Sequence, residues 1–255
     1  MGGTPLRVIV TRPAREAARW VEAFHARGID AVALPLIEIA PLLPGMPTGP
    51  LDAGPHAALM FVSAAAVDGF FERHGAIAEA RCWATGPGTA QALRRAGVPA
   101  GRIDAPPADA ARFDSEALWA RVQGQVRPGT RVLRVRGGNA AGQPAGRDWL
   151  ARTLEAAGAV VDTAVVYRRL APQWDETVRA LALQAAGDAR HAWLFSSSEA
   201  IANLRAELPE VGWHSARAWA THTRIAEAAR AAGFGTVIEV PPALDALVAS
   251  IESIG

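Results

Sequence analysis

Lysine is missing from this chain, and cysteine is almost missing. All 26 basic residues are arginine, which excludes a Schiff-base lysine and a lysine-containing phosphate-binding loop. The single cysteine, Cys82, can form neither an internal disulfide nor a cysteine-rich zinc site. An excess of one charge is missing too. The net charge of +1 excludes the broad basic field that gathers nucleic acid or anionic lipid.

Long hydrophobic runs and metal-binding patterns are also missing. No apolar run reaches the roughly 18 residues of a membrane span, so no membrane association is expected. The 6 histidines show no metal-ligand spacing, so no metal is expected. The glycine-rich stretches do not form the dinucleotide-binding pattern after a strand. The opening residues MGGTPLRVIV enter a strand pattern at once, without the pattern of a signal peptide, and we expect a cytoplasmic protein.

What the chain does contain is a long internal repeat. Its 255 residues are enough for two domains of about 100–150 residues each. Residues 83–97 (WATGPGTAQALRRAG) and 219–233 (WATHTRIAEAARAAG) align without a gap and are identical at eight of fifteen positions. Two further pairs match, RVIVTR with RVLRVR and FVSAAAV with FSSSEAI, at residues 7–12, 131–136, 61–67 and 195–201. The sequence therefore predicts two similar domains that arose by duplication.

Short apolar runs alternate with helix-like segments in both halves. Strands are expected at residues 6–10, 31–37, 58–62, 82–85, 132–135, 160–167, 192–195 and 218–221. Most of these runs are followed by a segment with apolar residues at helical spacing. Strands that alternate with helices imply parallel sheets with helical crossovers. We therefore expect an α/β protein with two flavodoxin-like parallel-sheet domains.

Two arrangements of these domains fit the pattern. The Pro/Gly-rich stretch 41–55 and the segment 170–174 are natural exits from a domain. Each half of the chain could fold by itself. Alternatively, the first strand–helix–strand joins the C-terminal quarter, and residues 41–166 form one continuous domain. The two connecting segments would then lie side by side as a double linker.

The loops that follow the expected strands are rich in Ser, Thr and Gly. In open parallel sheets, ligands bind beyond the carboxyl ends of the strands, where helix amino ends present free N–H groups. Small residues let these groups approach a ligand, and the helix dipole favours anions. Two domains with such loops could face each other across a cleft as a receptor for a polyanion. The same residue types are also ordinary helix N-caps. The candidates from these loops are Thr11, Arg12, Ser63, Gly86, Thr89, Arg136, Gly137, Ser197, Ser198 and Thr223.

Three of the remaining features concern single side chains. Arg12 and Arg136 occupy matching positions of the repeat, just after a strand, where an arginine can bind a carboxylate or simply lie at the surface. Tyr167 is the only tyrosine. It lies at the end of a strand and the start of a predicted linker, so it either faces a cleft between the domains or packs at a domain edge.

Together these segments resemble the uroporphyrinogen-III synthase family. The resemblance covers nearly the whole chain and rests on the order and spacing of several motifs. These are VIVTRP, ALPLIEIAP, FVSAAAVDGFF, ATGPGTAQALRRAG, RVLRVRGGN, VVYRRLAP, LFSSSEAI and ATHTRIAEAARAAG. The resemblance implies two flavodoxin-like domains joined by a two-stranded linker. Residues 1–37 with 171–255 would form domain 1, and residues 41–166 would form domain 2, with linkers near 38–42 and 166–172.

The resemblance also implies a lyase reaction without a cofactor. Hydroxymethylbilane, a linear tetrapyrrole with eight carboxylates, loses its hydroxyl group and closes to uroporphyrinogen III with the last ring inverted, through an azafulvene and a spiro-pyrrolenine. A tyrosine suits this reaction because its ordinary pKa of about 10 keeps it protonated at neutral pH. The alternative function is a cleft-forming binding protein that closes on a small anion without chemistry. Nothing in the sequence demands more than a monomer.

The family resemblance assigns roles residue by residue. Tyr167 matches the linker tyrosine that assists departure of the hydroxyl group. Ser63, Thr89 and Ser197 match positions that line the cleft. The second GPxTA-like loop departs from the family pattern, because His222-Thr223 replaces Gly86-Pro87 and Ile225 stands where Thr is usual. Backbone amides or Arg224 would supply the contact there.

Overall fold

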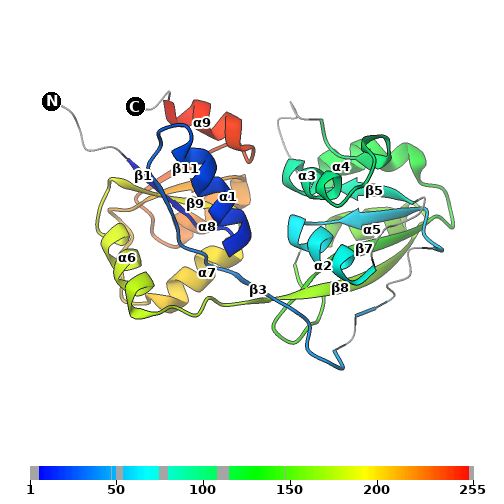
Figure 1. The fold of residues 1–255 in the computed structure, drawn as a ribbon, viewed down its shortest axis with the longest axis horizontal. Helices are drawn as coiled ribbons and strands as arrows, with labels where there is room; N and C mark the ends of the chain where they lie inside the picture. The colour runs from blue at the N-terminus through cyan, green and yellow to red at the C-terminus, as the bar shows by residue number, and fades with distance from the viewer. Residues whose placement is uncertain are drawn as a thin grey trace. The chain divides into compact units, whose positions relative to one another are not determined.

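The computed structural model describes residues 6–46, 48–49, 54–74, 80–107, 115–146 and 148–252. The chain divides into two compact units. Met1–Glu38 and Leu170–Gly255 form unit 1, and Ile39–Arg169 form unit 2. Each unit is built on its own sheet (Figure 1). Among the described helices, none is long and apolar enough to cross a bilayer.

The sheet of unit 1 has five parallel strands in the order β11-β10-β9-β1-β2. The strands are β1 (Arg7–Val10), β2 (Ala31–Ala33), β9 (His191–Phe195), β10 (Arg217–Ala220) and β11 (Thr236–Glu239). Counted along the chain, this is the 2-1-3-4-5 order of flavodoxin-like sheets. The strand order reverses between β1 and β9, and ligands of such sheets bind at the carboxyl side of that point.

Five helices accompany this sheet. They are α1 (Ala14–His25), α6 (Glu176–Ala186), α7 (Ser198–Glu207), α8 (Thr223–Ala231) and α9 (Leu244–Glu252). Polar side chains begin three of them, since Asp175, Ser197 and His222 each accept a backbone N–H from the first turn. Val8, Val10, Ala192, Leu194 and Trp219 from the strands form one core cluster with Phe24 and Leu247 from the helices.

The sheet of unit 2 has six strands in the order β3-β8-β7-β4-β5-β6. They are β3 (Glu38–Ala40), β4 (Ala58–Phe61), β5 (Arg81–Ala84), β6 (Ile103–Asp104), β7 (Arg131–Gly138) and β8 (Val160–Leu170). The pairs β4–β5, β4–β7, β5–β6 and β7–β8 are parallel. The predicted α/β class with parallel sheets is therefore confirmed.

Both faces of the second sheet are buried at its central strand β4. Alternate residues of β4 enter two different core clusters: Leu59 and Phe61 join one, and Ala58 and Met60 join the other. This follows from the period of two along a strand. The accompanying helices are α2 (Ala64–His74), α3 (Pro87–Arg95), α4 (Ser115–Val122) and α5 (Trp149–Ala156), with 3-10 turns η1 (Ala100–Arg102) and η2 (Gln123–Gln125).

The repeated segments occupy corresponding strands. β4 and β9 carry one pair, β5 and β10 the second, and β7 and β1 the third. Read from its β6 edge, the sheet of unit 2 runs β6-β5-β4-β7-β8, and the sheet of unit 1 runs β11-β10-β9-β1-β2. The strands that carry matching repeats therefore occupy the same places in the two series. Each repeated segment thus has the same neighbours in its sheet. The duplication itself stays a prediction.

One predicted strand is shorter than expected. The strand predicted over residues 31–37 ends at Ala33. The N–H groups of Leu34 and Leu36 still bond to the carbonyls of Val10 and Thr11. Pro35 lies between them and has no backbone N–H. It faces the open edge of the sheet, where no strand needs that group. The chain therefore leaves the sheet of unit 1 here and next forms β3.

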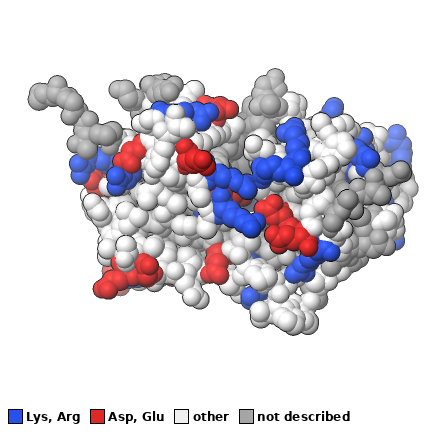
Figure 2. Space-filling model, in the orientation of Figure 1, with Lys and Arg blue, Asp and Glu red and all other residues white. Residues whose placement is uncertain are grey.

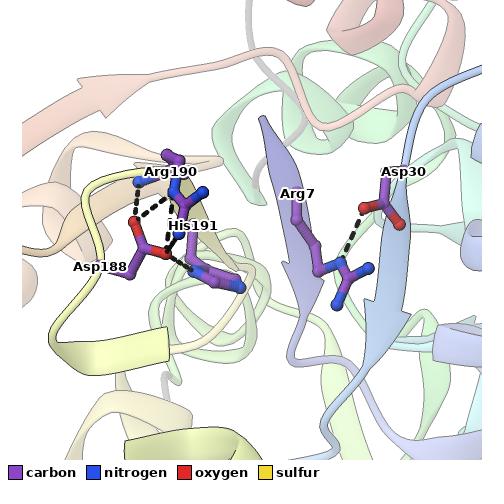
Figure 3. Close-up of polar contacts among 5 residues, drawn as sticks. All are labelled: Arg7, Asp30, Asp188, Arg190 and His191. Atoms are coloured by element: carbon purple, nitrogen blue, oxygen red, sulfur yellow. Dashed lines mark hydrogen bonds and ion pairs between the residues drawn. The ribbon is translucent and has the colours of Figure 1, made fainter. Parts of the chain in front are cut away.

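Charged groups gather at the amino ends of β1 and β9, the edge opposite to the expected site (Figure 3). Arg7 Nε donates to Asp30 Oδ2 at 2.7 Å. Asp188, just before β9, accepts from the guanidinium and the backbone N–H of Arg190 and lies 3.6 Å from His191 Nδ1. The hydrogen bonds from the Arg190 side chain and backbone lower the pKa of Asp188 to about 2.

This shift predicts a pH dependence. Asp188 is ionised when folded down to about pH 2 but takes up a proton in the unfolded chain near pH 4. Its stabilising effect is therefore present above pH 4 and is lost as the pH falls toward 2. We expect Asp188→Asn to have a lower Tm than the wild type at pH 7 and the same Tm near pH 2. A Tm difference that stays constant across this range would contradict the assignment. The expected difference is small because the ion pair with the exposed Arg190 is screened by solvent.

Candidate active site

The structure brings three of the candidate residues together at the carboxyl edge of the sheet of unit 2. Ser63 follows β4, Gly137 lies near the end of β7, and Tyr167 lies near the end of β8. The Ser63 Oγ and Tyr167 Oη atoms are 3.2 Å apart, within hydrogen-bond distance. β4 and β7 are neighbours, and the strand order of this sheet reverses between them. The contact thus lies where an open α/β sheet binds its ligand.

A β-bulge determines the face of the sheet on which the Tyr167 side chain lies. Along β7 and β8 the pairing is regular as far as Arg136 with Val165, and then Gly137 pairs with Tyr167. One extra residue, Val166, is thereby inserted in β8. Regular alternation would place Tyr167 on the opposite face from Val166. With the bulge, both side chains join the same core cluster against α2, where Tyr167 is 6% exposed.

Gly137 makes room for the tyrosine ring. A Cβ atom built on Gly137 would lie 2.3 Å from both Cε2 and Cζ of Tyr167 and 2.8 Å from its hydroxyl oxygen. Real Cβ contacts do not come that close, so any other residue at this position displaces the ring. Gly137 was predicted as a substrate-binding residue. The structure shows what its missing side chain does for Tyr167.

Ser63 is also the N-cap of α2. Its Oγ accepts the backbone N–H of Ala66 at 3.0 Å, and its carbonyl accepts those of Ala66 and Val67. The same hydroxyl therefore contacts both the amino end of a helix and the phenol of Tyr167. A serine after a buried strand is a common helix start, and that pattern alone does not reveal the second contact.

Gly86 and Thr89 lie at the start of α3, one strand further along the sheet. Gly86 is the N-cap in an extended conformation and has no capping side chain, and its carbonyl accepts the N–H of Ala90. Pro87 begins the helix and has no N–H. The first turn therefore offers the backbone N–H groups of Gly88 and Thr89. Thr89 is buried.

Arg136 is a buried member of an ion-pair cluster whose acid, Asp148, is half exposed. Arg136 is 5% exposed, and its Nη1 donates to Asp148 Oδ1 at 2.8 Å, while Nη2 donates to the Ala145 carbonyl. Arg134 Nη1 donates to the same oxygen of Asp148 at 2.6 Å. Burial, together with the nearby Arg134, lowers the pKa of Arg136. Both Nη groups of Arg136 thus already bind acceptors of the protein itself.

Arg134 and Asp148 were missed by the sequence analysis. Arg134 and Arg136 are two residues apart in one strand, so that their side chains share a face, and this period was visible in the motif RVLRVR. Asp148, the residue before α5, carried no comparable signal. Burial would raise its pKa, but the hydrogen bonds from Arg134 and Arg136 outweigh that effect and lower it.

In unit 1, Thr11 and Ser197 lie at the carboxyl ends of the neighbouring strands β1 and β9. Thr11 is 1% exposed, and its hydroxyl donates to the Leu194 carbonyl at 2.7 Å, which ties the two strand ends together. Ser197 caps α7 by accepting the Glu199 N–H at 3.2 Å. Ser198, the first residue of that helix, has a buried hydroxyl without a hydrogen-bond partner among the described residues.

Arg12 follows Thr11 and is held from two sides. Its Nη1 donates to Glu16 Oε2 at 3.1 Å, and its guanidinium carbon lies 4.1 Å from the centre of the Trp20 ring. Burial lowers the pKa of Arg12, and Glu16 opposes this effect. The side chain is thus fixed by an i,i+4 ion pair and a cation–π contact along α1.

The third loop of unit 1 begins α8. His222 replaces glycine as the N-cap, and its Nδ1 accepts the Arg224 N–H at 3.1 Å. The Thr223 hydroxyl donates to Glu239 Oε2 at 2.9 Å. Arg224 is exposed, and Ile225 is buried. The capping function of His222 was not predicted from the sequence.

The described residues hold neither a cluster of metal ligands nor a reactive thiol. On the face shown in Figure 2, described arginines and acidic residues both occur, and uncharged residues cover most of that face. Within the described part of the chain, no group of three His, Cys, Asp or Glu side chains is placed to hold a metal ion. Burial raises the pKa of the Cys82 thiol to about 12, so this thiol is protonated and unreactive at neutral pH.

The comparison with family models identifies one family. The family model described as Uroporphyrinogen-III synthase HemD matches residues 18–249. The structure of uroporphyrinogen-III synthetase from Helicobacter pylori is similar with a TM-score of 0.60 and 15% identity, over 98% of this chain and 100% of that one. A mutant uroporphyrinogen III synthase from Thermus thermophilus is similar with a TM-score of 0.51 and 17% identity, over 97% of this chain and 98% of that one. No curated protein sequence matches the chain. The structural similarities, at these identities, show a shared fold.

Proposed function

The chain belongs to the uroporphyrinogen-III synthase family, and we propose that the residues at the carboxyl ends of its strands bind hydroxymethylbilane and direct its closure. The protein is a cyclising lyase of tetrapyrrole biosynthesis. The observation that carries the proposed site is the contact between the Tyr167 and Ser63 hydroxyl groups at the point where the strand order of unit 2 reverses. A binding protein without chemistry is not favoured, because the family is one of enzymes.

Tyr167 is the proposed proton donor. As the C–O bond of the substrate breaks, its electron pair stays on oxygen, which takes the phenolic proton and leaves as water. The cationic carbon then forms a bond with the substituted carbon of the last ring, and rearrangement inverts that ring. The proton released when the ring becomes aromatic again returns the phenolate to phenol. The balance is one substrate giving one macrocycle and one water, with no oxidant or cofactor.

The eight carboxylates of the substrate need many donors spread over a wide surface. Backbone N–H groups at the amino ends of α2, α3, α7 and α8 are suited to this, because helix amino ends favour anions. A few weak contacts per carboxylate also let the product leave. The proposed substrate-binding residues are Thr11, Arg12, Ser63, Gly86, Thr89, Arg136, Gly137, Ser197, Ser198, Thr223 and Arg224. Of these, Thr11 and Arg136 would act mainly by holding the loops, since the Thr11 hydroxyl and both Nη groups of Arg136 already donate to protein acceptors.

Selectivity is a matter of conformation in this proposal. Hydroxymethylbilane closes without the enzyme, but to the symmetric type I isomer. The protein must therefore hold the chain so that attack by the substituted carbon wins over simple closure. Strand ends and helix amino ends of a rigid sheet are suited to that task, because they fix the positions of many donors at once.

Units 1 and 2 would act as two domains joined by a double linker near residues 38–42 and 166–172. The chain passes between the units twice, after Glu38 and after Arg169, and β3 lies next to β8 in the sheet (Figure 1). These facts support two connecting segments that run together. We further propose a monomeric, cytoplasmic enzyme; the lone, buried Cys82 is compatible with a reducing compartment.

Chromatography of the porphyrin isomers tests the function. Freshly made hydroxymethylbilane is incubated with the protein, the products are oxidised, and types I and III are separated. We expect type III to dominate. Type I alone, formed at the rate of a blank without protein, would mean that the chain lacks the activity of its family.

A further inference from the structure

We infer that Ser63 is a positioning residue for Tyr167, because it links the phenol to the amino end of α2. The inference rests on the proposed role of Tyr167 as proton donor and concerns what makes that phenol a suitable acid. Ser63 was expected only as a substrate-binding residue or as a helix cap. The geometry shows its hydroxyl between a backbone N–H and the phenolic oxygen.

The direction of the two hydrogen bonds follows from the groups involved. A hydroxyl has one proton to donate and can accept two. The Ser63 Oγ already accepts the Ala66 N–H, which can only donate. When Tyr167 gives its own proton to the substrate, Ser63 must be the donor in the 3.2 Å contact between the two oxygens. The chain then runs in one direction, from Ala66 N–H through the Ser63 hydroxyl to the oxygen of Tyr167.

This chain favours the phenolate that forms during proton transfer. Hydrogen bonds that point the same way polarise one another, and the amino end of a helix carries partial positive charge. Ser63 thus brings the field of α2 to an oxygen that becomes negative as the hydroxyl group leaves. It also leaves the phenolic O–H directed away from Ser63, because the Ser63 proton occupies the near side of the Tyr167 oxygen.

The two units differ at this point. Ser197 has the matching position in the repeat and caps α7 in the same way, through the Glu199 N–H. The segment after β2, which corresponds to the end of β8, holds Leu34, Leu36 and Ile37, all buried and apolar. The chain has 1 tyrosine. The link between a capping serine and a phenol is therefore a property of unit 2, and Ser197 offers a matched control.

The lone tyrosine gives a direct readout. Tyrosine labelled with carbon-13 at Cζ yields one resonance, whose shift at neutral pH reports the hydrogen bond and whose change at alkaline pH reports ionisation. We compare the wild type with Ser63→Ala, Ser63→Gly and Ser63→Thr. Glycine removes the hydroxyl but is nearly as good an N-cap, so this variant keeps the helix start. Threonine restores the hydroxyl.

We expect Ser63→Ala and Ser63→Gly to change the chemical shift of the Tyr167 resonance at neutral pH and to move its alkaline titration to higher pH. Both variants should lower kcat about fivefold with little change in KM, which is the effect of losing one hydrogen bond. Ser63→Thr should restore both. Ser197→Ala should leave the resonance unchanged. Asp175→Ala, which removes the cap of α6, should leave the resonance and kcat unchanged.

Two results would overturn the inference. One is a Tyr167 resonance that is the same in Ser63→Gly as in the wild type. The other is a loss of kcat on Ser63→Gly that is equally large in a Tyr167→Phe background, since a residue that acts through the phenolic hydroxyl has no effect once that hydroxyl is gone. If Tyr167→Phe keeps full activity, the proposed role of the tyrosine fails, while the resonance still tests the contact.

Discussion

Tyr167→Phe should lower the kcat for the type III isomer by about 10-fold to 100-fold. General acid catalysis typically contributes about 100-fold or more, and the hydroxyl group of this substrate is already labile enough to leave without enzyme, so the effect belongs at the low end. KM should change little, because the ring stays in the core and only one oxygen is removed. The share of type I product should rise as the uncatalysed closure competes. Single-turnover kinetics with separation of the isomers measures both quantities.

A hydroxyl elsewhere in unit 2 provides the control. Thr153 donates to the Trp149 carbonyl within α5 at 2.9 Å and is not one of the proposed site residues. Thr153→Val should leave kcat and the isomer ratio as in the wild type. If Tyr167→Phe also keeps the wild-type kcat, the tyrosine is only a core residue, and another group protonates the departing oxygen.

Much of the fold could be predicted from local pattern. Buried strands followed by capped helices predict a parallel sheet, and the repeat predicts which strands correspond. The end of β2 was predicted too late because Pro35 interrupts a run that is otherwise apolar. The chain also forms β3, β6 and β11, which are short and partly exposed at their sheet edges, where hydrophobic pattern is weak.

The candidate site was predicted by residue type but not by contact. Tyr167 stood out as the lone tyrosine at a strand end, and Ser63 as a serine after a buried strand. Their meeting depends on the bulge at Val166 and on the pairing of β7 with β8, neither of which has a local sequence signal. The ion pair of Arg136 with Asp148 likewise joins residues that only the packed fold brings together. Long-range register therefore limits what sequence pattern alone can assign.

Gly137→Ala should impair the enzyme through Tyr167. The new methyl group would lie 2.3 Å from two ring carbons, so the ring or the strand must move. Overpacking of this kind typically costs about 1–3 kcal/mol of stability. A shift of about 1 Å in a catalytic group can cost about 100-fold in rate, so kcat should fall as far as in Tyr167→Phe. Urea unfolding and single-turnover kinetics measure the two effects separately.

A double variant separates them further. In a Tyr167→Phe background, Gly137→Ala should still lower the free energy of unfolding, because the clash involves ring carbons that phenylalanine keeps. It should cause no further loss of kcat, because the hydroxyl is already gone.

Two other glycines of unit 2 serve as references. Gly101→Ala meets nothing within 4 Å and should be neutral in both measurements. Gly158 has φ +85° and lies against Pro128, so Gly158→Ala should lose stability but keep kcat. A kcat for Gly137→Ala that matches the value for Gly158→Ala would show that the glycine serves only the packing of β7. If Gly137→Ala lowers kcat only in the background that retains Tyr167, the space left by Gly137 is what allows the phenol to lie where the substrate needs it.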